Sequence, residues 1–132
     1  MAELLILQKQ DNNLKFLKER LGRFPKHKIY LERHSLTASL ESLDHIQQLQ
    51  LRDLPIPDAI VLDGNFLTDA YPCSDGETII NRRHELGLSI HIIGYSVVYM
   101  SQHMDEFKIH PGLDIGKNPN NLFRVLDELF ER

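Results

Sequence analysis

The chain is predicted to form an α/β domain, with a five-stranded parallel sheet in the order 2-1-3-4-5 and helices on both faces. Two observations lead to this prediction. Short apolar runs, at residues 4–7 and 59–62, are typical of strands that are buried on both faces. The segments between such runs carry apolar residues at helical spacing, and strands that alternate with helices form parallel sheets. The length of 132 residues is that of a single domain, residues 1–132.

The first half of the chain is expected to contain two pairs of a strand and a helix. Residues 4–7 form the first strand, and Asp11 or Asn12 then caps a helix that Gly22 ends. Residues 28–31 form the second strand. The helix that follows has apolar residues three and four positions apart along one face, namely Leu36, Leu40, Leu43, Ile46 and Leu49.

The alternation continues in the second half of the chain. Residues 59–62 form the third strand, and a loop over residues 65–75 precedes the next helix. That helix covers residues 77–86, and Gly87 ends it. Residues 89–93 form the fourth strand.

The final third of the chain has weaker patterns until its last helix. Residues 97–112 are expected to form a short or irregular helix, because polar residues interrupt the apolar stripe. Residues 113–115 are a weak fifth strand. Asn120 or Asn121 then begins a helix with Leu122, Val125, Leu126, Leu129 and Phe130 on its buried side.

Polar residues follow the predicted strands at their carboxyl ends. They are Gln8 and Lys9 after the first strand, Asp63 after the third, Ser96 after the fourth and Lys117 after the fifth. The carboxyl ends of parallel strands share one edge, where α/β proteins bind their ligands. Asp63, Ser96 and Lys117 can meet there only if strands three, four and five are neighbours. This requirement leads to the predicted order 2-1-3-4-5.

A carboxylate, a hydroxyl and an ammonium group are the set required to accept a phosphoryl group. The carboxylate attacks the phosphorus, and the other two groups hold the charged oxygens. We therefore predict Asp63 as the candidate phospho-acceptor, with Ser96 and Lys117 beside it. Each residue also has a structural alternative: Asp63 can cap the following turn, Ser96 can cap a helix, and Lys117 can be a solvated surface lysine.

These residues resemble those of the receiver domain of bacterial two-component response regulators, which has a flavodoxin-like fold. The resemblance covers residues 4–130. Asp63 stands at the phospho-acceptor position, residues 72–76 match Pro-x-x-Asp-Gly, Ser96 stands at the Ser/Thr position and Lys117 at the lysine position. The resemblance implies a signalling domain, rather than an enzyme, that receives a phosphoryl group from a histidine kinase or phosphotransfer protein.

Because of its departures from the family, the chain resembles an atypical or pseudo-receiver domain. Receivers carry two adjacent acidic residues after the first strand, which bind magnesium together with the acceptor aspartate, but here Gln8 and Lys9 occupy these positions. Residues 68–71 lengthen the loop after the third strand, and Asp114 falls near the family's aromatic position. We therefore expect no required cofactor and at most weak Mg2+ binding, with Asp63 as its acidic ligand.

Composition excludes several other classes of protein. A formal net charge of −4 argues against a nucleic-acid surface, which depends on clustered lysine and arginine. The apolar runs are too short for a membrane span, and no signal peptide opens the sequence. The single cysteine, Cys73, fits a reducing compartment, so a cytoplasmic location is expected.

Other catalytic or metal-binding motifs are absent from the sequence. The seven histidines form no His-x-x-x-His or His-Glu-x-x-His pair, and no glycine-rich nucleotide loop is present. A phosphatase of the haloacid dehalogenase type would carry Asp-x-Asp after its first strand, and the chain has none there.

Two classes of function therefore remain, with a third more remote. The first is a phospho-accepting signalling domain, and the second is a non-phosphorylated docking module. The third is a flavodoxin-like protein that binds a small molecule in the same crevice. The expected contact face is the segment that begins at Val97 and ends at Gly112, because Val98, Tyr99 and Met100 exceed what its weak stripe can bury. This face is predicted to bind a signalling protein or to form a homodimer. The docking module could instead use the lengthened loop after the third strand.

Overall fold

Four parallel strands form a sheet in the part of the chain that the structure describes, which comprises residues 2–8, 12–23, 26–63, 74–95 and 119–130. The structure is a computed structural model. The strands are β1 (Glu3–Leu7), β2 (Lys28–Arg33), β3 (Ala59–Leu62) and β4 (His91–Gly94). Their order in the sheet is β2-β1-β3-β4, and every neighbouring pair is parallel.

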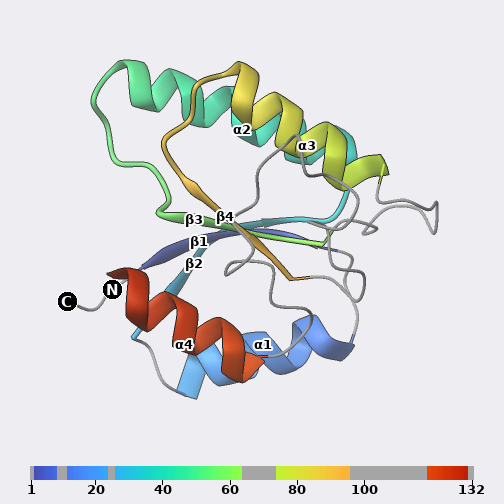
Figure 1. The fold of residues 1–132 in the computed structure, drawn as a ribbon, viewed down its shortest axis with the longest axis vertical. Coiled ribbons are helices and arrows are strands. Elements are labelled where there is room, and N and C mark those ends of the chain that lie inside the picture. The colour runs from blue at the N-terminus through green and yellow to red at the C-terminus, as the bar shows by residue number, and fades with distance from the viewer. Residues whose placement is uncertain (1, 9–11, 24–25, 64–73, 96–118, 131–132) are drawn as a thin grey trace.

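Helices cover both faces of this sheet (Figure 1). The helices α2 (Leu36–Leu51) and α3 (Ser74–Glu85) lie on one face, and α1 (Asn12–Arg23) and α4 (Pro119–Phe130) lie on the other. The sequence predicted this α/β architecture and the relative order of the first four strands, and both predictions are confirmed.

Alternate residues of the central strands supply two separate hydrophobic cores. Leu5 and Leu7 of β1 pack into the core beneath α2 and α3, whereas Leu4 and Ile6 pack into the core beneath α1 and α4. All four residues of β3 are fully buried. A continuous apolar run is therefore what a strand with a helix layer on each side requires.

Caps are seen at the start of α2, where the sequence analysis named none, and at the end of α3, where Gly87 was predicted. Ser35 caps α2, since its hydroxyl accepts a hydrogen bond from the Ala38 amide at 3.1 Å. Gly87 adopts a φ of 62°, and the amides of Gly87 and Leu88 donate to the carbonyls of His84 and Arg83. Glycine accommodates this left-handed conformation without steric cost, so Gly87 ends the helix α3 as predicted.

Gly22 was expected to end the first helix, and this prediction is wrong. The helix α1 continues through Gly22 to Arg23, and Gly22 does not adopt a positive φ. Arg20 and Arg23 lie in the last turn of α1, where positive charge favours the helix because of its macrodipole. The end of α1 is therefore stabilised by charge instead of by a left-handed glycine.

The fourth strand begins two residues later than predicted, at His91 instead of residue 89. The Ser89 amide donates to Gln50 Oε1 at 3.1 Å, and the Ile90 carbonyl accepts from Arg83 Nη2 at 2.7 Å. Side chains of α2 and α3 thus bind the backbone groups that a neighbouring strand would otherwise pair. Strand pairing starts at His91, whose amide donates to the Asp58 carbonyl at 3.3 Å.

Two other boundaries also differ from the prediction. The strand β2 continues beyond residue 31 to Arg33, which pairs with Leu7 of β1. The helix α3 begins at Ser74, earlier than the predicted residue 77. The predicted fifth strand at residues 113–115 and the predicted contact segment, residues 97–112, lie outside the described residues. Within the described residues, no helix is long and apolar enough to span a membrane.

Candidate functional site

The carboxyl ends of the strands lie at one edge of the sheet. Backbone hydrogen bonds between neighbouring strands continue there for one residue beyond the strands. The Asp63 amide donates to the Leu7 carbonyl at 3.1 Å, and the Tyr95 amide donates to the Leu62 carbonyl at 2.8 Å. The Gln8 amide donates to the Arg33 carbonyl at 3.2 Å. These bonds hold the backbones of Gln8 and Asp63 side by side on neighbouring strands, as the order of β1 and β3 requires.

Asp63 is buried at this edge, with a relative exposure of 5%. It follows a strand that is buried along its whole length, so the fold carries its carboxylate to the end of the central layer. Burying a carboxylate costs free energy unless other groups stabilise its charge, and aspartates in such positions are frequent in functional sites. Asp63 thus lies where the sequence predicted it, at the carboxyl end of the central strand β3.

Gln8 is fully buried beside Asp63. Neither the Nε2 nor the Oε1 atom of its side chain has a hydrogen-bond partner within the described chain. An unsatisfied buried amide costs about 1–3 kcal/mol of stability. The sequence predicted Gln8 as a replacement of an acidic residue, but nothing in the sequence indicated that its amide would be buried without a partner.

His34 also lies at this edge, and the sequence analysis missed it. Its Nδ1 atom forms a short hydrogen bond with the Gln8 carbonyl, and its Nε2 atom lies 3.2 Å from Glu32 Oε1. Lys18 Nζ of α1 lies 3.2 Å from the same Glu32 oxygen. The only sequence signal for His34 was its position directly after the edge strand β2.

The charge of Glu32 is stabilised by these neighbours. Burial by itself would raise the pKa of Glu32, but hydrogen bonds from His34 and Lys18 outweigh burial and lower the pKa below its ordinary value. Both ring nitrogens of His34 face oxygen acceptors, and a neutral imidazole has only one N–H to donate.

Three of the predicted site residues lie outside the described residues: Lys9, Ser96 and Lys117. The structure therefore brings together Gln8 and Asp63 from the predicted set. Of the Pro-x-x-Asp-Gly match at residues 72–76, residues 74–76 form the first turn of α3.

The donor set at this edge does not fit the magnesium site that the fold family implies. Mg2+ is bound by oxygen ligands, with carboxylates supplying its charge neutralisation. Here the described residues supply the Asp63 carboxylate and the neutral Gln8 amide oxygen. Within the described chain, no three His, Cys, Asp or Glu side chains come together as a metal site. Among the residues that the structure describes, one carboxylate in place of three would leave the double charge of the ion largely uncompensated.

Comparison with solved structures identifies the architecture. No family model matches the sequence, and no curated protein matches it. The fold is similar to the receiver domain of the histidine kinase CKI1 from Arabidopsis thaliana complexed with Mg2+ and BeF3−, with a TM-score of 0.66 and 16% identity over 99% of this chain and 91% of that chain.

A second similar structure comes from a bacterium. It is the signal receiver domain of a modulated diguanylate cyclase from Desulfovibrio desulfuricans G20, with a TM-score of 0.66 and 15% identity over 99% of this chain and 94% of that chain. Both similarities extend over nearly the whole chain. The protein therefore has a receiver-like fold, as its resemblance to receiver domains implied.

Proposed function

We propose that this chain is a receiver-like signalling domain of a two-component or phosphorelay system, acting in the cytoplasm through protein–protein interaction. The observation that carries this proposal is Asp63, a buried aspartate at the carboxyl end of the central strand β3. In the receiver-like fold this is the edge at which chemistry is expected. The domain acts as a phospho-acceptor and a docking surface, not as an enzyme.

In this proposal a histidine kinase or a phosphotransfer protein is the donor. The Asp63 carboxylate attacks the phosphorus of a phosphohistidine, the P–N bond breaks, and the imidazole leaves as an aspartyl phosphate forms. Ser96 and Lys117 hold the phosphoryl oxygens. In the predicted strand order, these two residues follow the fourth and fifth strands at the same edge of the sheet as Asp63.

The buried Gln8 amide favours a second candidate, a non-phosphorylated docking module. A neutral amide beside Asp63 cannot replace a carboxylate as a magnesium ligand of equal charge. We further propose that Lys9 occupies the place of the metal and pairs with Asp63, so that phosphorylation by small donors is slow. Output in both candidates passes through the segment from Val97 to Gly112, as a homodimer or with a signalling partner.

The experiment that tests phospho-acceptance is labelling of the purified chain with acetyl phosphate and Mg2+, read by intact mass. We expect slow labelling that Asp63→Asn abolishes, and weak magnesium binding by calorimetry. Labelling that persists in Asp63→Asn would reject Asp63 as the acceptor. Rapid labelling of the wild-type chain would reject the proposed role of Lys9.

A double substitution, Gln8→Asp with Lys9→Asp, tests whether the missing acidic pair is the cause. We expect this variant to gain magnesium binding and faster labelling of Asp63. The matched control is Gln48→Glu with Lys15→Glu, which changes the net charge by the same amount at exposed positions on α2 and α1. A gain in both variants, or in neither, would contradict the proposal.

A further inference from the structure

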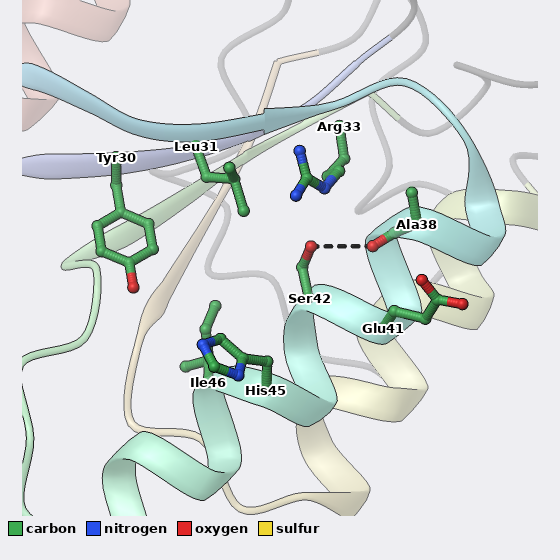
Figure 2. Close-up of a pocket in the computed structure, with 8 residues that line it drawn as sticks. All are labelled: Tyr30, Leu31, Arg33, Ala38, Glu41, Ser42, His45 and Ile46. Carbon is green, nitrogen blue, oxygen red and sulfur yellow. Dashed lines mark hydrogen bonds between the residues drawn. The ribbon is translucent and has the colours of Figure 1, made fainter.

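A pocket of about 440 Å3 lies between the edge strand β2 and the helix α2. Its walls are Tyr30, Leu31 and Arg33 from β2, and Ser42, His45 and Ile46 from α2 (Figure 2). Its volume falls within the range of small-molecule sites, about 300–1,000 Å3. The pocket is distinct from the site of Asp63, since β1 separates β2 from β3 in the sheet.

A β-bulge in the edge strand shapes this pocket. Leu4 of β1 pairs with Ile29 and Leu5 pairs with Leu31, so Tyr30 is an extra residue without a partner on β1. Before the bulge, Ile29 packs against the core beneath α1 and α4, and after it, Leu31 packs against the core beneath α2 and α3. The bulge therefore places Tyr30 and Leu31 together on the pocket wall.

Arg33 is a cation without a carboxylate partner within the described residues. Its guanidinium donates a hydrogen bond from Nη1 to the carbonyl of Glu32, at 3.1 Å. A guanidinium has five N–H donors in a planar fork that matches carboxylate and phosphate oxygens. Figure 2 shows this guanidinium over the space between β2 and α2. Most of its donors therefore remain available to a ligand.

The other groups of the pocket complement an anion with an apolar body. The Tyr30 ring extends from β2 toward α2, and its hydroxyl can donate a further hydrogen bond (Figure 2). Leu31 and Ile46 supply an apolar surface. The Ser42 hydroxyl already donates to the Ala38 carbonyl at 2.9 Å, and Glu41 also lines the pocket, at the end away from Tyr30 and His45 (Figure 2).

We propose that this pocket binds a small organic anion, a carboxylate or a phosphate ester with an apolar ring. Arg33 pairs with the anionic oxygens, the Tyr30 hydroxyl donates to them, and the ring packs on Leu31 and Ile46. A small molecule fits better than an added peptide strand, because a bulge distorts an edge and disfavours regular strand addition. The formal net charge of −4 gives the chain no general attraction for anions.

The test is a titration of the isotope-labelled full chain with benzoate and, separately, with phenyl phosphate, followed by NMR shifts of the backbone amides. Benzamide is the neutral probe of the same shape. We expect saturable shifts at residues 29–46 with either anion, and at least about tenfold weaker binding of benzamide, because charged hydrogen bonds discriminate strongly. Saturation by benzoate only, or by phenyl phosphate only, would identify the carboxylate or the phosphate as the ligand class.

Variants separate the pocket from adventitious binding. Arg33→Gln should weaken binding of the anion at least about tenfold, and Arg33→Lys should weaken it less. Arg23→Gln removes the same charge from an exposed position on α1 and should leave the affinity unchanged. Equal affinity in Arg33→Gln, equal binding of benzamide, or an absence of saturable shifts at residues 29–46 would overturn the proposal. If Arg33→Gln does not fold, the benzoate and benzamide comparison in the wild-type chain decides.

Discussion

The two ends of the parallel sheet differ in how completely their polar groups are paired. At the amino-terminal end, Asp58 Oδ2 accepts from the Glu3 amide at 2.8 Å, and the Asp58 amide donates to the Glu3 carbonyl at 2.8 Å. At the carboxyl-terminal end, the buried Gln8 side chain has no partner for either polar atom within the described residues. The first arrangement pairs the Asp58 carboxylate and amide with the Glu3 backbone, whereas the second leaves an amide unsatisfied within the described residues.

The hydrogen-bond partners of the histidines also differ between the two ends of the sheet. At the amino-terminal end the buried His27 accepts from the Ala2 amide at Nδ1, at 3.0 Å, and its Nε2 lies 3.0 Å from Asp127 Oδ1. This geometry suits the neutral ring with its hydrogen on Nε2. His34, at the opposite end, faces oxygen acceptors with both nitrogens. His27 thus meets one donor and one acceptor, whereas His34 meets two acceptors.

This difference indicates which end of the sheet maximises stability. Fully satisfied buried polar networks stabilise one packing, while unsatisfied groups lower stability and are retained mainly at functional sites. The amino-terminal end therefore serves the fold, and the carboxyl-terminal end carries the candidate site. The comparison predicts that removing a buried, paired polar group at the amino-terminal end will lower stability, whereas removing the buried Gln8 amide at the carboxyl-terminal end will not.

The largest expected effect is that of His27→Ala at the amino-terminal end. We expect a loss of about 3 kcal/mol of unfolding free energy, because the change opens a cavity and leaves the Ala2 amide without its acceptor. Urea denaturation measures this loss. The control is His45→Ala at an exposed position of α2, which should change stability by less than about 0.5 kcal/mol. Equal effects of the two changes would contradict the comparison.

Asp58→Ala should cost less, about 1–2 kcal/mol, because it removes one hydrogen bond to the backbone at a partly buried position. Asp58→Asn keeps a side-chain oxygen in place and should recover part of the loss. Thermal unfolding of the two variants measures the difference. If Asp58→Ala matches the wild-type protein in stability, the amino-terminal network contributes nothing and its contrast with the other end disappears.

Gln8→Met at the carboxyl-terminal end should be neutral or stabilising by about 1 kcal/mol. An apolar side chain of similar size removes the cost of the unsatisfied amide. Gln50→Met is the matched control, since the Gln50 amide binds the Gly87 carbonyl at 3.1 Å and the Ser89 amide at 3.1 Å. It should lose about 1 kcal/mol. A loss in Gln8→Met as large as that in Gln50→Met would mean that the Gln8 amide is satisfied in solution.

Much of the fold could be predicted from the sequence because its signals are local. Residues 59–62 are apolar without interruption, and they form the strand that is buried on both faces. Gly87 follows an apolar helical stripe and was therefore predicted to end a helix. It does so in the left-handed conformation. Gly22 carried the same signal, but α1 continues through it. A glycine permits a helix to end without requiring it.

The site was only partly predictable because its remaining features depend on distant partners. The position of Asp63 follows from a single strand. The contact of His34 with the Gln8 carbonyl depends on the pairing of β1 with β2, and so does the bulge at Tyr30. The burial of Gln8 depends on packing around the edge of the sheet. No spacing within the sequence encodes these pairings.

The smallest expected effect is on the pH dependence of stability, and it again compares the two ends. At the amino-terminal end, hydrogen bonds from His27 and Lys26 lower the pKa of Asp127, although burial acts against them. At the carboxyl-terminal end, burial raises the pKa of Glu32, but His34 and Lys18 lower it further than burial raises it. Both carboxyls therefore bind protons less readily in the folded chain than in the unfolded chain.

A carboxyl with a lower pKa in the folded state stabilises the fold above its unfolded pKa, and this contribution is lost as the pH falls through its folded pKa. Unfolded aspartate and glutamate titrate near about 3.9 and 4.3, so the losses should begin below about pH 4.5. We expect Asp127→Asn and Glu32→Gln to be less stable than the wild-type chain at pH 7 by under about 1 kcal/mol each, because these carboxylates are partly exposed to solvent. Each difference should shrink toward zero between about pH 4.5 and pH 2, as the wild-type carboxyl becomes protonated.

Urea denaturation across this range measures both, with Glu128→Gln on the exposed side of α4 as the control for loss of a surface charge. A difference that stays constant as the pH falls would mean that the carboxylate charge is not what stabilises that end of the sheet.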